Sequence, residues 1–116
     1  MSADLWGYQP AVDYTAGSSL IGYKVEATDG TIGKVDKHSD DVGASHLVVD
    51  TGVWIFGKHV LIPAGLVVGI DTAGERIYVG RTKEEIKNAP EFDKDKHAGD
   101  VGYHEQLGGY YQSHRA

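Results

Sequence analysis

The sequence predicts an all-β fold, a small antiparallel β-barrel of about six strands with a short C-terminal helix and extended, aromatic-rich termini. Two observations support this prediction. Short apolar segments recur at intervals of about 8 to 14 residues, a spacing typical of small barrels and sandwiches. Turn-forming residues separate these segments, and Val, Ile and Leu are concentrated in residues 20–80.

The first two strands flank Asp29-Gly30, a dipeptide typical of tight hairpin turns. Gly33 lies inside the second strand, where we expect a β-bulge or a sharp bend of the kind that small barrels need. The alternation of apolar and polar residues indicates the inward-facing side chains of this hairpin, which are Val25, Ala27, Ile32 and Val35.

Further strands are expected in the segments SHLVVDTG, KHVLIP and RIYVG, with a polar loop over residues 37–44. Pro63 ends the KHVLIP strand, because proline cannot donate a hydrogen bond to a neighbouring strand. The segment AGLVVGID adds a short apolar stretch between the last two of these strands.

A helix of roughly two turns is expected in TKEEIKNAPEFD, because Thr82 and Glu85 have the spacing of a capping box. Pro90 ends this helix. Residues 91–102 are polar and contain glycine, so we predict a linker there. Beyond it, one face of a short helix would carry Tyr103, Leu107, Tyr110 and Tyr111, although Gly108-Gly109 disfavours a helix.

This pattern divides the chain into residues 1–16, an extended N-terminal arm; residues 17–93, one barrel domain; and residues 94–116, a linker with a short Tyr-rich segment. The folded centre is expected to hold about 70 residues, with looser ends. Trp6, Tyr8 and Tyr14 give the N-terminal arm its aromatic character. They can lie on the surface of the domain itself or contact a partner.

The net charge is −6, and most of it lies outside the centre: residues 1–16 carry −2, residues 17–83 carry −1 and residues 84–116 carry −3. Without a cluster of Lys and Arg, nucleic acid is disfavoured as a partner. The chain has no cysteine, and no apolar run is long enough to span a bilayer. We expect a soluble, cytoplasmic protein without a transmembrane segment.

Asp50-Thr51-Gly52 follows three apolar residues, as the catalytic aspartate of an aspartic protease does. A chain of this length would have to dimerise to pair two such carboxylates. IYVGRTKEEI resembles the second signature of these proteases, but only 30 residues separate Asp50 from Gly80, and Trp54 stands where a small residue is usual. The alternative that we favour is a strand that ends in a turn at Asp50.

Metal and phosphate sites have weak support in the sequence. Gly30-Thr-Ile-Gly33-Lys34 is too short for a phosphate-binding loop, and the six histidines show no zinc-binding spacing. Asp40, Asp41 and His38 could form a weak cation site in the polar loop. We predict that the chain needs no metal and no other cofactor.

Trp54, Ile55 and Phe56 lie between two glycines in the connection between two strands. Three large apolar residues in a row cannot all point into a small core. One alternative is that at least one of them is exposed and contacts another protein. The other is that the loop folds back over an open end of the barrel.

The segment from Leu20 to Asp93 resembles the PRC-barrel domain, which occurs in the photosynthetic reaction centre H subunit and in a ribosome maturation factor. The resemblance rests on GYKVEATDGTIGKVDKHSDD, HLVVDTG, KHVLIPAGLV and ERIYVGRTKEEIKNAPEF, and Tyr110-Tyr111 is similar to the tails of stand-alone bacterial members. It implies a barrel that binds proteins, with no shared catalytic motif. It also implies that Asp50 ends a barrel strand.

The function that we predict is a non-enzymatic protein-interaction or structural module that associates with itself, another protein, or both. Tyr and Trp are common anchors at interfaces, so the expected contact residues are Trp6, Tyr8, Tyr14, Trp54, Ile55, Phe56, Tyr103, Tyr110 and Tyr111. Two alternatives stay open: a dimeric aspartic-protease-like enzyme that uses Asp50, and a barrel that binds a small ligand or a cation.

Overall fold

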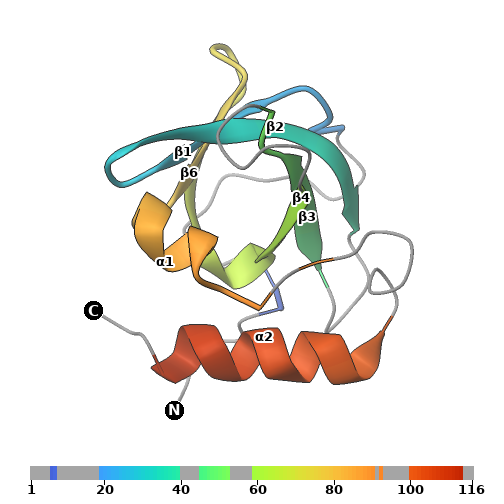
Figure 1. Cartoon of the computed structure of the whole chain (residues 1–116). Coiled ribbons are helices and arrows are strands. Elements are labelled where there is room, and N and C mark those ends of the chain that lie inside the picture. Colours follow the sequence, from blue (N-terminus) through green and yellow to red (C-terminus); the bar gives the residue numbers. More distant parts are fainter. Residues whose placement is uncertain are drawn as a thin grey trace.

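The computed structural model describes residues 6–7, 19–39, 45–52, 59–90, 92 and 100–113. In these residues six strands curve around a common interior, and the long helix α2 runs beneath it (Figure 1). The elements are β1 (Lys24–Ala27), β2 (Gly30–Ser39), β3 (His46–Asp50), β4 (His59–Pro63), η1 (Ala64–Leu66), β5 (Val67–Asp71), β6 (Arg76–Val79), α1 (Lys83–Lys87) and α2 (Val101–Ser113).

The six strands form one sheet in the order β4-β3-β2-β1-β6-β5. The mostly-β, barrel-like fold and the number of strands confirm the prediction. The prediction of a purely antiparallel sheet is wrong at one place, because β1 and β6 pair in parallel. The hairpin formed by β5 and β6 joins the sheet beside β1, which is the first strand of the chain. In the described part of the chain, β4 and β5 do not close the barrel by hydrogen bonds.

Gly33 lies at the bulge between β1 and β2, as the sequence predicts. The register shifts between Val25 and Glu26, which pair with Gly33 and Thr31. Gly33 has a φ of +155°, which side chains rarely adopt. A Cβ atom there would overlap the carbonyl oxygen of Asp50. Glycine therefore lets β2 bend tightly against the end of β3.

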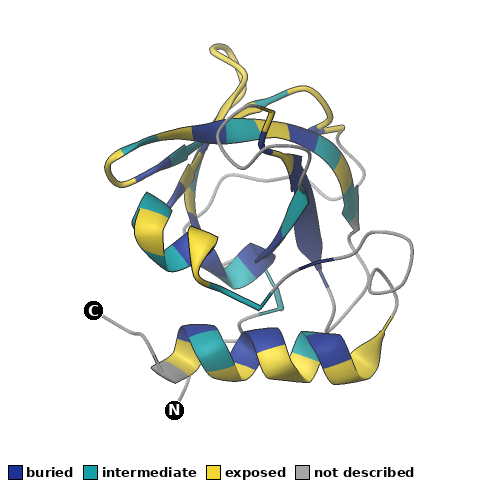
Figure 2. Ribbon diagram, in the orientation of Figure 1, coloured by how far each residue is buried: buried dark blue, intermediate teal, exposed yellow. Residues whose placement is uncertain are grey.

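The core fills the space between the curved sheet and the two helices. All four residues expected to face inward from the first hairpin are buried. Figure 2 shows that the buried face of α2 points toward the sheet. The fully buried side chains are Tyr111, Leu20, Ile32, Leu47, Leu61, Ile62, Ile77, Ile86, Leu107, Val25, Val49 and Val67.

Helix α1 begins at the predicted capping box. The backbone N–H of Glu85 donates to Thr82 Oγ1 at 3.1 Å, and the backbone N–H of Thr82 donates to Glu85 Oε1 at 3.3 Å. The helix has 5 residues, fewer than the two turns expected, because Asn88 already ends it two residues before Pro90.

Helix α2 replaces part of the predicted linker and part of the loose C-terminal segment. Asp100 Oδ1 accepts hydrogen bonds from the backbone N–H groups of Gly102 at 2.9 Å and Tyr103 at 3.3 Å, which is the role of an N-cap. Tyr103, Leu107 and Tyr111 form the buried face and join the core of the sheet. Packing against that core stabilises the helix despite its paired glycines.

Candidate functional site

Two large apolar side chains lie exposed on neighbouring strands at the β5 end of the sheet. Val68 is 58% exposed and Tyr78 is 41% exposed, while their neighbours Val67 and Val79 are buried. Their packing shows that they share one side of the sheet. A Cβ atom on Gly80, two residues beyond Tyr78 on the chain, would lie 3.0 Å from Val68 Cγ1. We call Val68 and Tyr78 the outer spot.

An ion pair flanks the outer spot. Arg76 is two residues before Tyr78, and its Nη1 lies 3.1 Å from Glu26 Oε2. Glu26 is the residue of β1 that pairs with Tyr78 in the parallel register. Thr31 Oγ1 donates to the same carboxylate at 2.9 Å. The outer face of the sheet thus carries an apolar centre beside one positive and one negative group, a combination typical of protein interfaces.

Five of the residues predicted to contact a partner lie outside the described part of the chain: Tyr8, Tyr14, Trp54, Ile55 and Phe56. Trp6 is described and half-buried. Its ring stacks on His104 of α2 with the centroids 4.7 Å apart and meets His46 edge-on at 6.4 Å. Of the alternatives for this arm residue, the structure shows contact with the domain itself.

The C-terminal tyrosines are placed differently from the prediction of an aromatic surface. Tyr103 is 5% exposed and Tyr111 is 0% exposed, because both face the core of the chain itself. Tyr110 is half-buried, and its hydroxyl donates to the backbone carbonyl of Glu85 at 2.6 Å. In this fold the three rings attach α2 to the rest of the domain.

The sequence reasoning missed the outer spot, although a signal for it exists. Leu66, Val67 and Val68 are consecutive apolar residues, so they cannot all point inward from a strand. In the same way, Tyr78 alternates with Ile77 and Val79, which occupy the core. The exposure of Val68 and Tyr78 thus follows from the same geometry as the expected exposure in the segment from Trp54 to Phe56.

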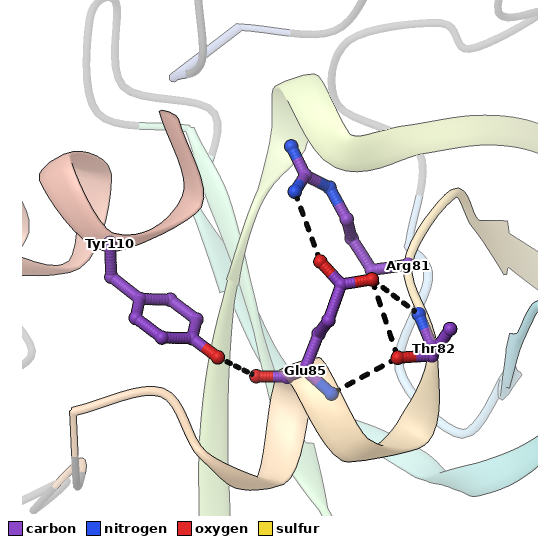
Figure 3. Close-up of polar contacts among 4 residues, drawn as sticks. All are labelled: Arg81, Thr82, Glu85 and Tyr110. Atoms are coloured by element: carbon purple, nitrogen blue, oxygen red, sulfur yellow. Dashed lines mark hydrogen bonds and ion pairs between the residues drawn. The ribbon is translucent and has the colours of Figure 1, made fainter. Parts of the chain in front are cut away.

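Figure 3 shows how α2 is attached to the start of α1. Arg81 Nη1 lies 3.3 Å from Glu85 Oε2, and Tyr110 of α2 reaches the backbone of the same glutamate. The guanidinium of Arg81 also lies 5.5 Å from the centre of the Tyr111 ring, within the range of a cation–π contact. One arginine therefore links the capping box of α1 to the buried face of α2.

The ionisation of this cluster follows from its contacts. Burial raises the pKa of Glu85, but the backbone N–H of Thr82 and the charge of Arg81 together lower it more, so the net shift is below the usual 4.5. Burial, and then the negative Glu85, raise the pKa of Tyr110. Tyr110 is therefore protonated at neutral pH and remains a hydrogen-bond donor.

We expect Glu85→Gln to lower the stability at pH 7 by about 1 kcal/mol, because the ion pair with Arg81 is only partly buried and solvent screens it. Glutamine at position 85 can keep the hydrogen bonds of the capping box, but it loses the negative charge that pairs with Arg81. The folded pKa of Glu85 is below its unfolded value, so its contribution is present above the unfolded pKa and is lost as the pH falls through the folded pKa. Urea unfolding at pH 7 and pH 3 measures this, with exposed Glu84→Gln as the control. An equal loss at both pH values would contradict it.

Asp50 has the geometry of a turn residue. It ends β3, it is exposed, and its Oδ1 accepts the backbone N–H of Gly52 at 2.9 Å. Gly52 itself has a φ of +58°, which glycine tolerates well. The strand that was expected to end in a turn at Asp50 is confirmed.

The described residues contain no group of three or more His, Cys, Asp or Glu side chains that could hold a metal ion. His38 lies on β2, where its Nε2 accepts the backbone N–H of Leu20 at 3.2 Å. Asp40 and Asp41 lie outside the described residues, so the weak cation site stays a hypothesis. No helix within the described ranges is long and apolar enough to cross a membrane.

The strands and helices described above define the chain as a mostly-β, barrel-like domain. No protein-family model matches the chain, and no curated protein matches it. A solved structure from Pseudomonas aeruginosa, described as the 16S ribosomal RNA processing protein RimM, is similar to it. That likeness has 22% sequence identity and a TM-score of 0.48, and it covers 56% of this chain and 42% of that chain. The chain therefore spans less than half the length of that protein.

Proposed function

We propose that this chain is a non-enzymatic protein-interaction module that binds a second copy of itself through the outer spot. The observation that carries the proposal is the exposure of Val68 and Tyr78 on the paired strands β5 and β6. Large apolar side chains that are exposed on neighbouring strands favour burial against a partner. We also propose that the domain is a PRC barrel, which the sequence resemblance supports.

A second copy fits this surface because the surface is complementary to itself. Many homodimers have two-fold symmetry, in which the same patch of each copy faces the other. Arg76 and Glu26 put opposite charges on one side of the outer spot. A two-fold axis through the spot can bring Arg76 of each copy toward Glu26 of the other while the apolar side chains meet at the centre.

The test is the absolute mass of the full chain in solution, measured by light scattering after size exclusion. We expect a dimer, and we expect Val68→Thr with Tyr78→Thr to give a monomer, because threonine keeps the β propensity and removes apolar area. The matched control is Val101→Thr, since Val101 is 67% exposed but lies on α2. A monomeric wild type, or equal effects of both replacements, would contradict the proposal.

Charge reversal tests the two-fold arrangement separately. Arg76→Glu makes the flank wholly negative, and Glu26→Arg makes it wholly positive, so each variant alone is expected to be monomeric. A mixture of the two variants is expected to form mixed dimers, since the flanks are then opposite in charge. Failure to associate on mixing, with both variants folded by circular dichroism, would overturn this arrangement. Trp54→Ser with Phe56→Ser shows whether that loop contributes as well.

A further inference from the structure

Helix α2 is attached to the rest of the domain by its side chains. The hydroxyl of Tyr103 donates to the backbone carbonyl of Pro90 at 2.9 Å, and the hydroxyl of Tyr110 donates to that of Glu85 at 2.6 Å. The strands, in contrast, are joined to one another by ladders of backbone hydrogen bonds. Figure 2 shows that the outward face of α2 is largely exposed. Release of α2 therefore breaks side-chain contacts and leaves the ladders of the sheet intact.

The joint between α2 and the sheet is incompletely filled. A partly open cavity of about 180 Å³ lies between α2, β4 and the segment after α1. Its lining includes Leu107 and Tyr111 of α2, together with Val60, Ala89 and Pro90 from the other elements. Atoms that line such a space lack packing contacts on that side. The contact of α2 with the domain is therefore weaker than the contact of close-packed core elements with each other.

The sequence of α2 favours unfolding of the helix once it has left the domain. Gly108 and Gly109 lie in its interior, and each glycine lowers the helix equilibrium about 5-fold relative to alanine. Isolated helices of about this length are marginal in water even when they are rich in alanine. Release of α2 and unfolding of α2 are therefore one step.

A residue of the N-terminal segment also contacts α2. The ring of Trp6 stacks on His104 of α2, and the backbone carbonyl of Trp6 accepts the N–H of Ser45 at 2.9 Å. Ser45 directly precedes β3, so Trp6 bridges the helix and the sheet. Release of α2 breaks the stack with His104, whereas the hydrogen bond to Ser45 belongs to the sheet side and does not depend on α2.

We propose that α2 is a strap that leaves the domain and unfolds as one unit while the six strands remain paired. Proteins open locally in such cooperative units, at a free energy below that of global unfolding. The open form uncovers apolar side chains that lie with α2 around the cavity, among them Leu61, Ile86 and Phe92. The domain thus has an apolar surface that is available only in the open form. This opening is independent of self-association through the outer spot.

The test is hydrogen exchange of the backbone amides of the full chain, followed by NMR under native conditions. We expect protection factors at Leu107 and Tyr111 that are at least about 10-fold below those at Leu47 and Val49 of β3, which pairs with strands on both sides. Urea below the unfolding transition is expected to speed exchange less at Leu107 than at Val49, because the opening of α2 exposes less surface than global unfolding.

Ile32→Val separates the opening of α2 from global unfolding. Ile32 is buried on β2, which lies across the interior from α2 (Figure 1). Loss of one buried methylene group is expected to speed exchange at Val49 about 5-fold. Exchange at Leu107 and Tyr111 is expected to stay unchanged, since Ile32 remains packed in the open form.

Gly109→Ala tests whether α2 opens as one unit. Nothing lies within 4 Å of the added Cβ atom, and the higher helix propensity is expected to slow exchange at Leu107 and Tyr111 by the same factor, about 5-fold. Unequal factors at these two amides would show fraying instead of a single opening. If α2 is as protected as β3, or if Ile32→Val speeds exchange equally in both, α2 opens only with the whole domain and the proposal is wrong.

Discussion

Replacing Gly33 with alanine is expected to lower the free energy of unfolding by about 3 kcal/mol or more. Two costs add at this position. The backbone has a φ of +155°, which an L side chain rarely adopts. The new Cβ atom would also overlap the carbonyl oxygen of Asp50 and lie 3.0 Å from the Cα atom of Thr51. This overlap can be removed only if β2 and β3 move apart at this point, and that movement breaks their pairing.

Urea unfolding followed by circular dichroism measures this effect. Gly109→Ala is the matched control, because nothing lies within 4 Å of the added atom there. Since Gly109 is inside α2, alanine is expected to stabilise the protein by up to about 1 kcal/mol. If Gly33→Ala unfolds at the same urea concentration as the wild type, the close approach of β2 to the end of β3 does not exist in solution.

Tyr111→Ala is expected to cost about 3–5 kcal/mol, the range found when a buried aromatic side chain is cut back to alanine. Tyr111 is 0% exposed and is among the largest fully buried side chains of the domain. Its loss also removes the ring that faces Arg81 and enlarges the cavity that Leu107 helps to line. Thermal unfolding and urea unfolding are both expected to shift strongly.

A variant of the neighbouring Tyr110 shows whether the loss of stability comes from core packing or from any change in α2. Tyr110→Phe keeps the ring and removes one hydrogen bond, so it is expected to cost only about 1 kcal/mol. If Tyr111→Ala is no more harmful than Tyr110→Phe, the C-terminal helix does not belong to the core. A fragment that ends at residue 90 would lack this buried face of α2.

The local patterns of the sequence predicted most of the strands correctly. Alternation identified Val25 and Ile32 as core residues, Gly33 as a bulge, and Pro63 as the end of a strand. The capping box at Thr82 was also correct, because its hydrogen bonds join residues three apart. Each of these features depends on contacts within a few residues of the chain.

The features that were missed depend on contacts between distant segments. The parallel pairing of β1 with β6 has no local signature. Asp100 was read as part of a linker, although an aspartate before apolar residues at helical spacing is a possible N-cap. The burial of Tyr103 and Tyr111 depends on where α2 lies, and an amphipathic helix does not reveal whether its apolar face meets its own domain or a partner.

The position of β1 has a consequence for how the protein is made. As the chain is synthesised, β2 can pair with β1, then β3 with β2, and then β4 with β3, since each of these pairs is antiparallel. The other edge of β1 can form its hydrogen bonds only after β6, which ends at Val79, has been synthesised. Such long-range pairing slows folding, and an open strand edge invites pairing between nascent chains. One edge of β1 therefore stays open on the ribosome until β6 has been synthesised.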